Sequence, residues 1–228
     1  MAISSSKPIV VEFNGLPGSG KTTIARILQE KLKQAGIPTI SRYARHRFLN
    51  NVYSIWLSPK YIKSLYTVNH LLKKYAIPQN RKARLSFSFF SRMYTHFLQD
   101  ESGVLVIDQG LIQSLLSILH IYPVLDDTWL DQLLLQSGIC KENILIVNVN
   151  CDPKAVKERI VARHKTSCRI DCLSEDEMDS AIRAQKKSLE IIRERFRTCY
   201  PGIRSVEIDS SMSPEENAIL LFDNLAMQ

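Results

Sequence analysis

This chain contains the stretch Ile9-Val-Val-Glu-Phe-Asn-Gly-Leu-Pro-Gly-Ser-Gly-Lys-Thr22, which decides its fold. The stretch joins a short apolar run, typical of a strand buried on both faces, to the pattern G-x-x-x-x-G-K-T, whose backbone N–H groups surround phosphate oxygens. Downstream, apolar residues recur at helical spacing until Gly36, a residue type common just after helix ends. The order strand, glycine-rich turn, helix predicts a phosphate-binding loop, and a nucleoside triphosphate is the first ligand that we expect.

Each residue type in this loop has an expected role. The glycines let N–H groups turn inward around phosphate oxygens, and the helix N-terminus adds the positive end of its dipole. We expect Lys21 to reach the β- and γ-phosphates and Thr22 to offer its hydroxyl to Mg²⁺. A glycine-rich turn with a surface lysine is the alternative, and the correct flanks on both sides favour the binding loop. The candidate nucleotide-binding residues are Gly15, Gly18, Ser19, Gly20, Lys21, Thr22 and Thr23.

Four further apolar runs alternate with helical patterns along the rest of the chain. Strands are predicted at residues 37–41, 104–107, 144–149 and 205–208. Helices are predicted at 45–57, 60–75, 81–99, 110–120, 127–137, 153–163, 174–198 and from 213 onward, the last two begun by capping boxes. This alternation predicts an α/β fold with a five-stranded parallel sheet between helices, and ligands then gather at the carboxyl ends of the strands.

Asp108 immediately follows the apolar run at 104–107. A carboxylate at the end of a buried strand is placed to hold Mg²⁺, or its water, near the γ-phosphate. The same group could take the proton of an acceptor hydroxyl, or it could only cap the helix that begins near Gly110. We therefore take Asp108 with Thr22 as the candidate metal-binding pair, and Asp108 with Lys21 as candidate catalytic residues.

Further candidate catalytic residues lie in an arginine-rich run. Arg159 and Arg163 are four residues apart on one helical face, and Arg169 lies in the loop that follows. Phosphoryl transfer depends on stabilising spread negative charge, so arginines on a closing loop suit it, and closure excludes water that would hydrolyse the donor. A solvated basic helix end is the alternative. We interpret residues 159–173 as a mobile lid.

The positive charge of the chain is concentrated in one segment. Residues 31–99 hold thirteen of the 30 Lys and Arg, none of the 23 Asp and Glu, and twelve of the eighteen aromatic residues. Basic and aromatic side chains that alternate in this way suit an anionic partner with a planar or apolar part, such as a nucleotide, a nucleic-acid strand or a lipid head group. Amphipathic helices with aromatic cores and solvated lysines are the alternative.

Composition and cysteine pattern favour a cytoplasmic enzyme built as a single domain over residues 1–228. The 45% hydrophobic content can fill a sizeable core, and no signal pattern or uninterrupted apolar span stands out. Five scattered cysteines, an odd number, fit a reducing compartment. One further spacing, His164-x₃-Cys168-x₃-Cys172, offers metal ligands, but the tighter C-x₂-C spacing and the fourth ligand typical of zinc sites are missing.

Several motifs together resemble the thymidylate kinase-like group of small P-loop kinases. They are the loop at 15–23, the strand ending Val-Ile-Asp108, the sequence Cys151-Asp-Pro after another strand, the arginine-rich lid, and Ile208-Asp-Ser-Ser-Met-Ser-Pro-Glu215. The resemblance in element order covers nearly the whole chain. It implies the P-loop NTPase fold, ATP and Mg²⁺, and a small acceptor lying over a helical acceptor-binding region at 42–100. It also implies that residues 209–211 help hold adenine, which makes Ser210 a candidate.

The departures from this group concern the acceptor. Asp108-Gln-Gly stands where the group has Asp-Arg or Glu-Arg-Ser, and no glutamate follows the second predicted strand. A neutral nucleoside is therefore a poor acceptor candidate, and an anionic one is better. The loop lacks an arginine at its variable positions, so the catalytic arginine is expected from the lid. By analogy with the group, Arg92 is the candidate acceptor-binding arginine, with Arg42 and Arg45 beside it, and Phe87 or Phe90 is expected to stack on a base.

These features predict an ATP- and Mg²⁺-dependent phosphotransferase for a small anionic acceptor, a nucleoside monophosphate such as dTMP being the first candidate, with a homodimer possible. One alternative is a kinase of a phosphorylated sugar, a lipid or another small molecule, acting at a membrane surface. Another is a nucleic-acid-associated P-loop ATPase, although the chain leaves little room for the partner domains of a motor. A GTPase is disfavoured because the guanine-reading Asn-Lys-x-Asp segment is missing.

Overall fold

A computed structural model of the chain describes residues 8–41, 59–74, 81–100, 102–119, 128–137, 143–163 and 169–226. Its centre is a five-stranded sheet with strand order β2-β3-β1-β4-β5, and every neighbouring pair is parallel. The strands are β1 (Ile9–Gly15), β2 (Thr39–Ser41), β3 (Val104–Ile107), β4 (Ile144–Asn150) and β5 (Arg204–Asp209). The predicted parallel sheet is confirmed, with strand bounds shifted by one or two residues.

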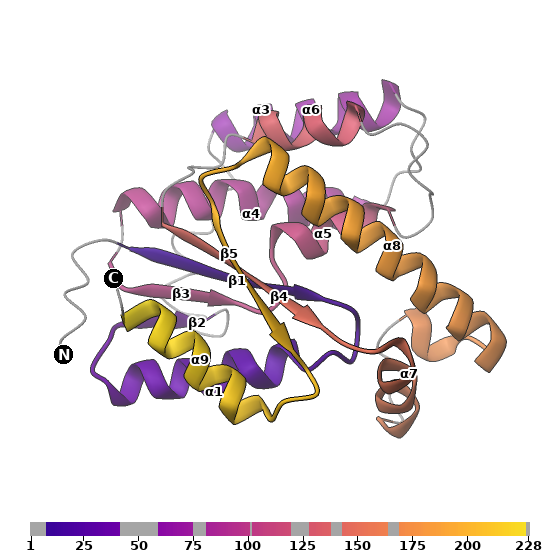
Figure 1. The fold of residues 1–228 in the computed structure, drawn as a ribbon. Helices are drawn as coiled ribbons and strands as arrows, with labels where there is room; N and C mark the ends of the chain where they lie inside the picture. The colour runs from indigo at the N-terminus through magenta and orange to yellow at the C-terminus, as the bar shows by residue number, and fades with distance from the viewer. Residues whose placement is uncertain are drawn as a thin grey trace.

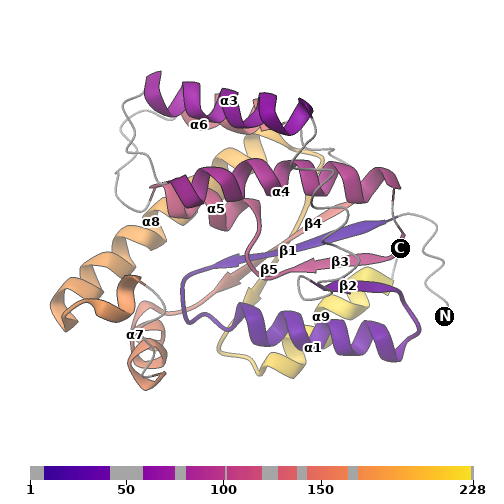
Figure 2. The same cartoon turned by 180° about the vertical axis from the view of Figure 1, so that it is seen from behind.

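Helices cover both faces of the sheet. On one face α1 (Lys21–Gln34) packs beside α9 (Pro214–Ala226), below the sheet in Figure 1. The other face carries α4 (Arg81–Asp100), α5 (Leu111–Leu119) and α8 (Glu175–Cys199), with α3 (Pro59–Lys74) and α6 (Thr128–Ser137) stacked outside them (Figures 1 and 2). The remaining α7 (Pro153–Ala162) and the short 3-10 helix η1 (Arg169–Cys172) lie beyond the end of β4.

Strand β1 divides the hydrophobic core in two because successive side chains point to opposite faces. Val11 and Phe13 pack with α1 and α9, whereas Val10 faces the core beneath α4, α5 and α8. All seven residues of β1 are buried, as expected of a central strand in a parallel sheet. This rigid central strand holds the phosphate-binding loop at its carboxyl end.

Helix starts predicted from capping boxes are confirmed. The Ser174 and Glu177 side chains form a capping box at the start of α8. At the start of α9, the Ser213 N–H and hydroxyl both donate to Glu216, whose own N–H donates to the Ser213 hydroxyl. The predicted helix at 45–57 lies outside the described residues.

Two findings bear on the expected setting of the protein. Among the described residues, no helix is both long and apolar enough to cross a membrane. Three cysteines fall in the described part of the chain, Cys151, Cys172 and Cys199, and each is a free thiol.

Candidate active site

The phosphate-binding loop is held by its lysine. Gly20 adopts a left-handed conformation with φ 89°, which ends the loop and lets α1 begin at Lys21. Lys21 is only 7% exposed, and its ammonium group donates to the carbonyl oxygens of Gly15 at 2.8 Å and Leu16 at 2.6 Å, and to Ser19 Oγ at 3.3 Å. These acceptors offset the cost of burying a charge. The loop therefore concentrates a positive charge, and the N-terminus of α1, at the carboxyl end of β1.

The two candidate metal-binding residues meet directly. The Thr22 hydroxyl, in the first turn of α1, donates to Asp108 Oδ2 at 2.8 Å, although 86 residues separate them in the chain. Asp108 follows the last residue of β3, as the sequence predicted. A hydroxyl and a carboxylate are hard oxygen donors, and Mg²⁺ binds proteins through one or two carboxylates plus phosphate oxygens. The residues present therefore fit Mg²⁺ beside the phosphate-binding loop.

Arg159 connects three segments that the sequence analysis had singled out separately. Lying on α7, it donates to the carbonyl oxygen of Ser210 at 3.0 Å and to that of Gly18 at 3.5 Å. Ser210 follows β5, and its own N–H bonds to the carbonyl of Asn150 at the end of β4. The guanidinium thus bridges the phosphate-binding loop and the loop predicted to hold adenine.

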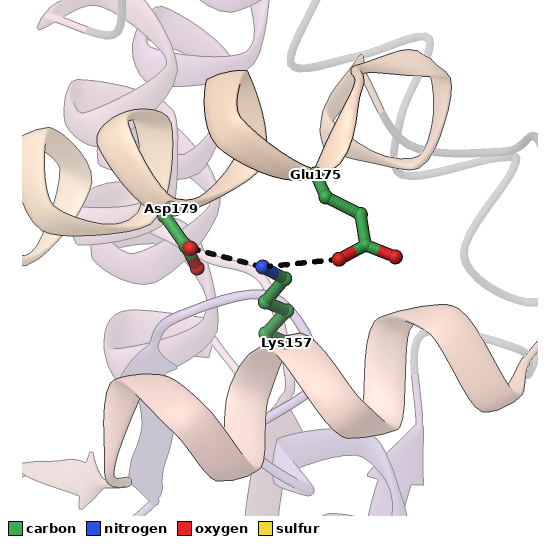
Figure 3. A network of polar contacts seen from close by, with 3 residues as sticks. All are labelled: Lys157, Glu175 and Asp179. Carbon is green, nitrogen blue, oxygen red and sulfur yellow. Dashed lines mark hydrogen bonds and ion pairs between the residues drawn. The ribbon is translucent and has the colours of Figure 1, made fainter.

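The base of the predicted lid is anchored by both charge and packing. Lys157 on α7 forms ion pairs with Asp179 at 2.9 Å and Glu175 at 3.7 Å on α8, as Figure 3 shows. Bonding to Asp179 raises the pKa of Lys157. Beside these pairs, Ile170 of η1 is fully buried in a small apolar cluster that includes Leu16 of the phosphate-binding loop. Ile170, shortly before α8, therefore shares an apolar core with the phosphate-binding loop.

The structure describes the side chain of only one of the two predicted lid arginines, Arg163 and Arg169. Arg163 is exposed at the end of α7. Arg169 begins η1, and its side chain lies outside the described part of the structure.

Of the candidate acceptor-binding residues, the structure describes the side chains of the two phenylalanines only. Phe87 is fully buried and Phe90 is 8% exposed, and both pack in the core between the sheet and the outer helices. Their rings fill that core because α4 turns its apolar side to the sheet, so the expected stacking on a base finds no support in their packing. Arg42 and Arg45 lie outside the described residues, as does the side chain of Arg92.

The possible metal spacing in the lid finds no support in the described residues. His164 and Cys168 fall outside them, and Cys172 is exposed. In the part of the chain that the structure describes, no group of three or more His, Cys, Asp or Glu could hold a metal ion.

A polar network under the site was missed by the sequence analysis. Arg193 of α8 donates to the side-chain oxygens of Asn14 and Asn150, each at 2.8 Å, at the carboxyl ends of β1 and β4. Asn150 and Asn148 in turn donate to Glu207 of β5 at 2.9 and 2.6 Å. The available signal was the presence of asparagines within otherwise apolar strand runs. This network ties α8, which follows the predicted lid, to the strands that carry the candidate site.

A second missed pair, Glu12 and Tyr94, lies beside the turn that follows β3. Glu12 of β1 is fully buried; its Oε2 accepts the Tyr94 hydroxyl at 2.6 Å and its Oε1 accepts the Ile112 N–H at 2.7 Å. Burial raises the pKa of Glu12 to about 7, although these hydrogen bonds lower it in part. Burial, and the neighbouring Glu12 charge, also raise the pKa of Tyr94. A single acid inside an apolar strand run was the signal in the sequence.

Comparison with known proteins agrees with this geometry. A family model described as "AAA domain" matches residues 11–183. A thymidylate kinase of Leptospira borgpetersenii serovar Hardjo-bovis (strain L550) is 51% identical over 35 residues, which cover 15% of this chain and only 17% of that enzyme's length.

Solved structures match over almost the full length. Deoxyadenosine kinase from M. mycoides with the products dCMP and a flexible dCDP superposes with a TM-score of 0.57 at 13% identity, covering 96% of this chain and 100% of that one. The same enzyme with bound dCTP gives 0.53 at 12% identity, with coverage of 96% and 100%. With bound dATP it gives 0.52 at 14% identity, with coverage of 95% and 99%. At these identities the likeness shows a shared fold.

Proposed function

The chain belongs to the AAA-domain family, and from this premise we propose that it is an ATP- and Mg²⁺-dependent phosphotransferase acting on a small anionic acceptor. A nucleoside monophosphate such as dTMP is the first acceptor to test. The observation that carries the proposal is the 2.8 Å hydrogen bond between Thr22 and Asp108. It brings a P-loop hydroxyl and a strand-end carboxylate together beside a buried lysine, the arrangement that phosphoryl transfer uses.

The donor site follows from the loop. On nucleotide binding, Lys21 would exchange the carbonyl oxygens of Gly15 and Leu16 for β- and γ-phosphate oxygens, while N–H groups from Gly18 to Thr23 bind the remaining oxygens. Thr22 and Asp108 would hold Mg²⁺. Bound there, Mg²⁺ supplies neutralisation of the charge that develops on the phosphoryl group.

The arginines divide between two roles in this proposal. Arg159 bridges Gly18 and Ser210, which favours a part in holding the nucleotide over the catalytic role first expected of it. Arg163 and Arg169, on the proposed lid at residues 159–173, would approach the transferred phosphoryl group when the lid closes. Ile170 and Leu16 belong to one buried apolar cluster, so the C-terminal part of the proposed lid and the phosphate-binding loop share a packed core.

The acceptor is assigned to the helical region at 42–100, within a single domain spanning 1–228. This region carries no acidic residue up to position 99, so its field favours an anion. Arg42, Arg45 and Arg92 are the proposed acceptor ligands. With Phe87 and Phe90 in the core, recognition of a base would fall to other residues of this region.

A coupled ATP-consumption screen over nucleoside monophosphates, nucleosides, sugar phosphates and single-stranded nucleic acid tests the proposal. We expect turnover with at least one monophosphate, and loss of about 100-fold or more of that turnover in Lys21→Ala, because the variant removes the charge that stabilises the transferring group. Stimulation only by nucleic acid would favour the ATPase alternative. Near-native turnover in Lys21→Ala, with the fold intact by circular dichroism, would overturn the mechanism.

A further inference from the structure

The buried pair Glu12 and Tyr94 lies where the central strand meets the turn that follows β3. Glu12 is the register partner of Ile107, the residue before Asp108. Its Oε1 accepts the N–H of Ile112 in the first turn of α5, and its Oε2 accepts the hydroxyl of Tyr94 from α4. The carboxyl group therefore joins the sheet, the helix after the Asp108 turn, and a helix of the proposed acceptor-binding region.

The turn itself packs directly on this pair. A Cβ built at Gly110 would lie 2.6 Å from the Glu12 carboxyl carbon and even closer to the Tyr94 hydroxyl oxygen. Such a separation is far below van der Waals contact, so only glycine fits there without displacing the turn or the pair. Gly110 thus lies directly against Glu12 and Tyr94, and the N–H of Ile112 bonds Glu12 just after the turn, in the first turn of α5.

At its near end the same turn is bonded to the phosphate-binding loop. The Asp108 carboxylate accepts the Thr22 hydroxyl. A displacement of the turn would therefore move one of the two oxygen ligands proposed for Mg²⁺ relative to the other. Since Mg²⁺ demands near-ideal octahedral geometry, a small displacement of one ligand lowers the affinity of the site for Mg²⁺.

We propose that Glu12 and Tyr94 are positioning residues that hold the Asp108 turn in the geometry needed to bind Mg²⁺ with the nucleotide. The inference rests on the proposed function, because it assigns a role towards that Mg²⁺ site. Glu12 is fully buried, so it acts on the turn indirectly, through its hydrogen bonds to Tyr94 and to the backbone of Leu111 and Ile112 at the start of α5. An apolar side chain would fill the same space without the cost of burying a carboxyl group, so a requirement for directed hydrogen bonds explains its presence.

The test compares ATP affinity with excess Mg²⁺ and with EDTA, measured by isothermal titration calorimetry. In the wild type, Mg²⁺ should tighten ATP binding. Tyr94→Phe removes only the hydroxyl that bonds Glu12, and we expect it to reduce this Mg²⁺ enhancement by about three- to tenfold, the range for one lost hydrogen bond. ATP affinity in EDTA should stay within about twofold of the wild type. Glu12→Gln should act in the same direction, because it replaces a carboxyl acceptor by an amide with one acceptor atom.

Tyr200→Phe is the matched control. The Tyr200 hydroxyl is also buried, and it donates to the Leu134 carbonyl between α8 and α6. Its removal should lower the melting temperature and leave the Mg²⁺ enhancement unchanged. If Tyr94→Phe and Glu12→Gln leave the Mg²⁺ enhancement unchanged, as this control does, the pair is part of the core only and the proposal is wrong. If one of the two does not fold, the other decides.

Failure of the proposed function has a different signature. It would appear in the wild type, as ATP binding that is undetectable or indifferent to Mg²⁺. In that case the positioning role is overturned with it. A wild type that responds to Mg²⁺ and variants that respond equally would overturn the positioning role alone.

Discussion

Replacing Glu12 by glutamine should make the protein more stable at pH 8 and remove the part of the pH dependence of unfolding between pH 5 and pH 8 that Glu12 contributes. Glutamine resembles the protonated carboxyl group in shape and charge. The exchange therefore reports how much the folded state opposes ionisation of a group that is fully buried in β1.

The magnitude follows from the two pKa values. Burial raises the pKa of Glu12 from the ordinary 4.5 to about 7, and each pH unit between the unfolded and folded values changes the free energy of unfolding by about 1.4 kcal/mol. Because the folded pKa is the higher one, the protonated Glu12 carboxyl group contributes stability to the folded state. This contribution is fully present below pH 4.5 and is lost as the pH rises through about 7. At pH 8 the glutamine variant should therefore exceed the wild type by about 3 kcal/mol.

Urea unfolding provides the assay, with tryptophan fluorescence, to which Trp129, buried in α6, contributes, and far-ultraviolet circular dichroism as two probes. Both proteins would be measured at pH 5, 6, 7 and 8 at one ionic strength. The values near pH 5 serve as the internal control, since there the wild type is mostly protonated at Glu12 and the two proteins should nearly agree. A stability difference that is the same at every pH would refute the reasoning.

Three further predictions concern the site. Asp108→Asn should lower turnover by about 100-fold while ATP affinity in EDTA changes less than about twofold, because it removes charge from the proposed Mg²⁺ ligand alone. A larger change in ATP affinity in EDTA would contradict this prediction. Arg159→Ala should raise KM for ATP by about tenfold with little change in KM for the acceptor, and the opposite pattern would place Arg159 on the acceptor side. Arg193→Lys should lower the free energy of unfolding by about 1–3 kcal/mol, measured in urea, because a single ammonium cannot bond both Asn14 and Asn150 in the planar geometry of a guanidinium. Unchanged stability would show that these bonds contribute little.

Local patterns predicted much of the fold because they act over short distances. The apolar run from Ile9 and the glycine-rich turn required only neighbouring residues, as did the two capping boxes at the starts of α8 and α9. Asp108 could be selected because the strand before it is a short uninterrupted apolar run. The aromatic residues of α4 were harder to interpret, since helical spacing is the same for a ring in the core and a ring against a ligand. Burial placed Phe87 and Phe90 in the core.

The sequence by itself therefore determined the strand, loop and helix that we propose bind phosphate, the acid at the end of β3, and the alternation that builds the parallel sheet. Only the tertiary structure decided which groups support them. Glu12 is hydrogen-bonded to Tyr94 and Ile112, which lie 82 and 100 residues further along the chain. Arg193 is hydrogen-bonded to Asn14, from which 179 residues separate it. Periodicity and turn chemistry carry no information about such pairs. They become neighbours because parallel strands bring their carboxyl ends to one edge of the sheet, where helices from distant parts of the chain pack against them.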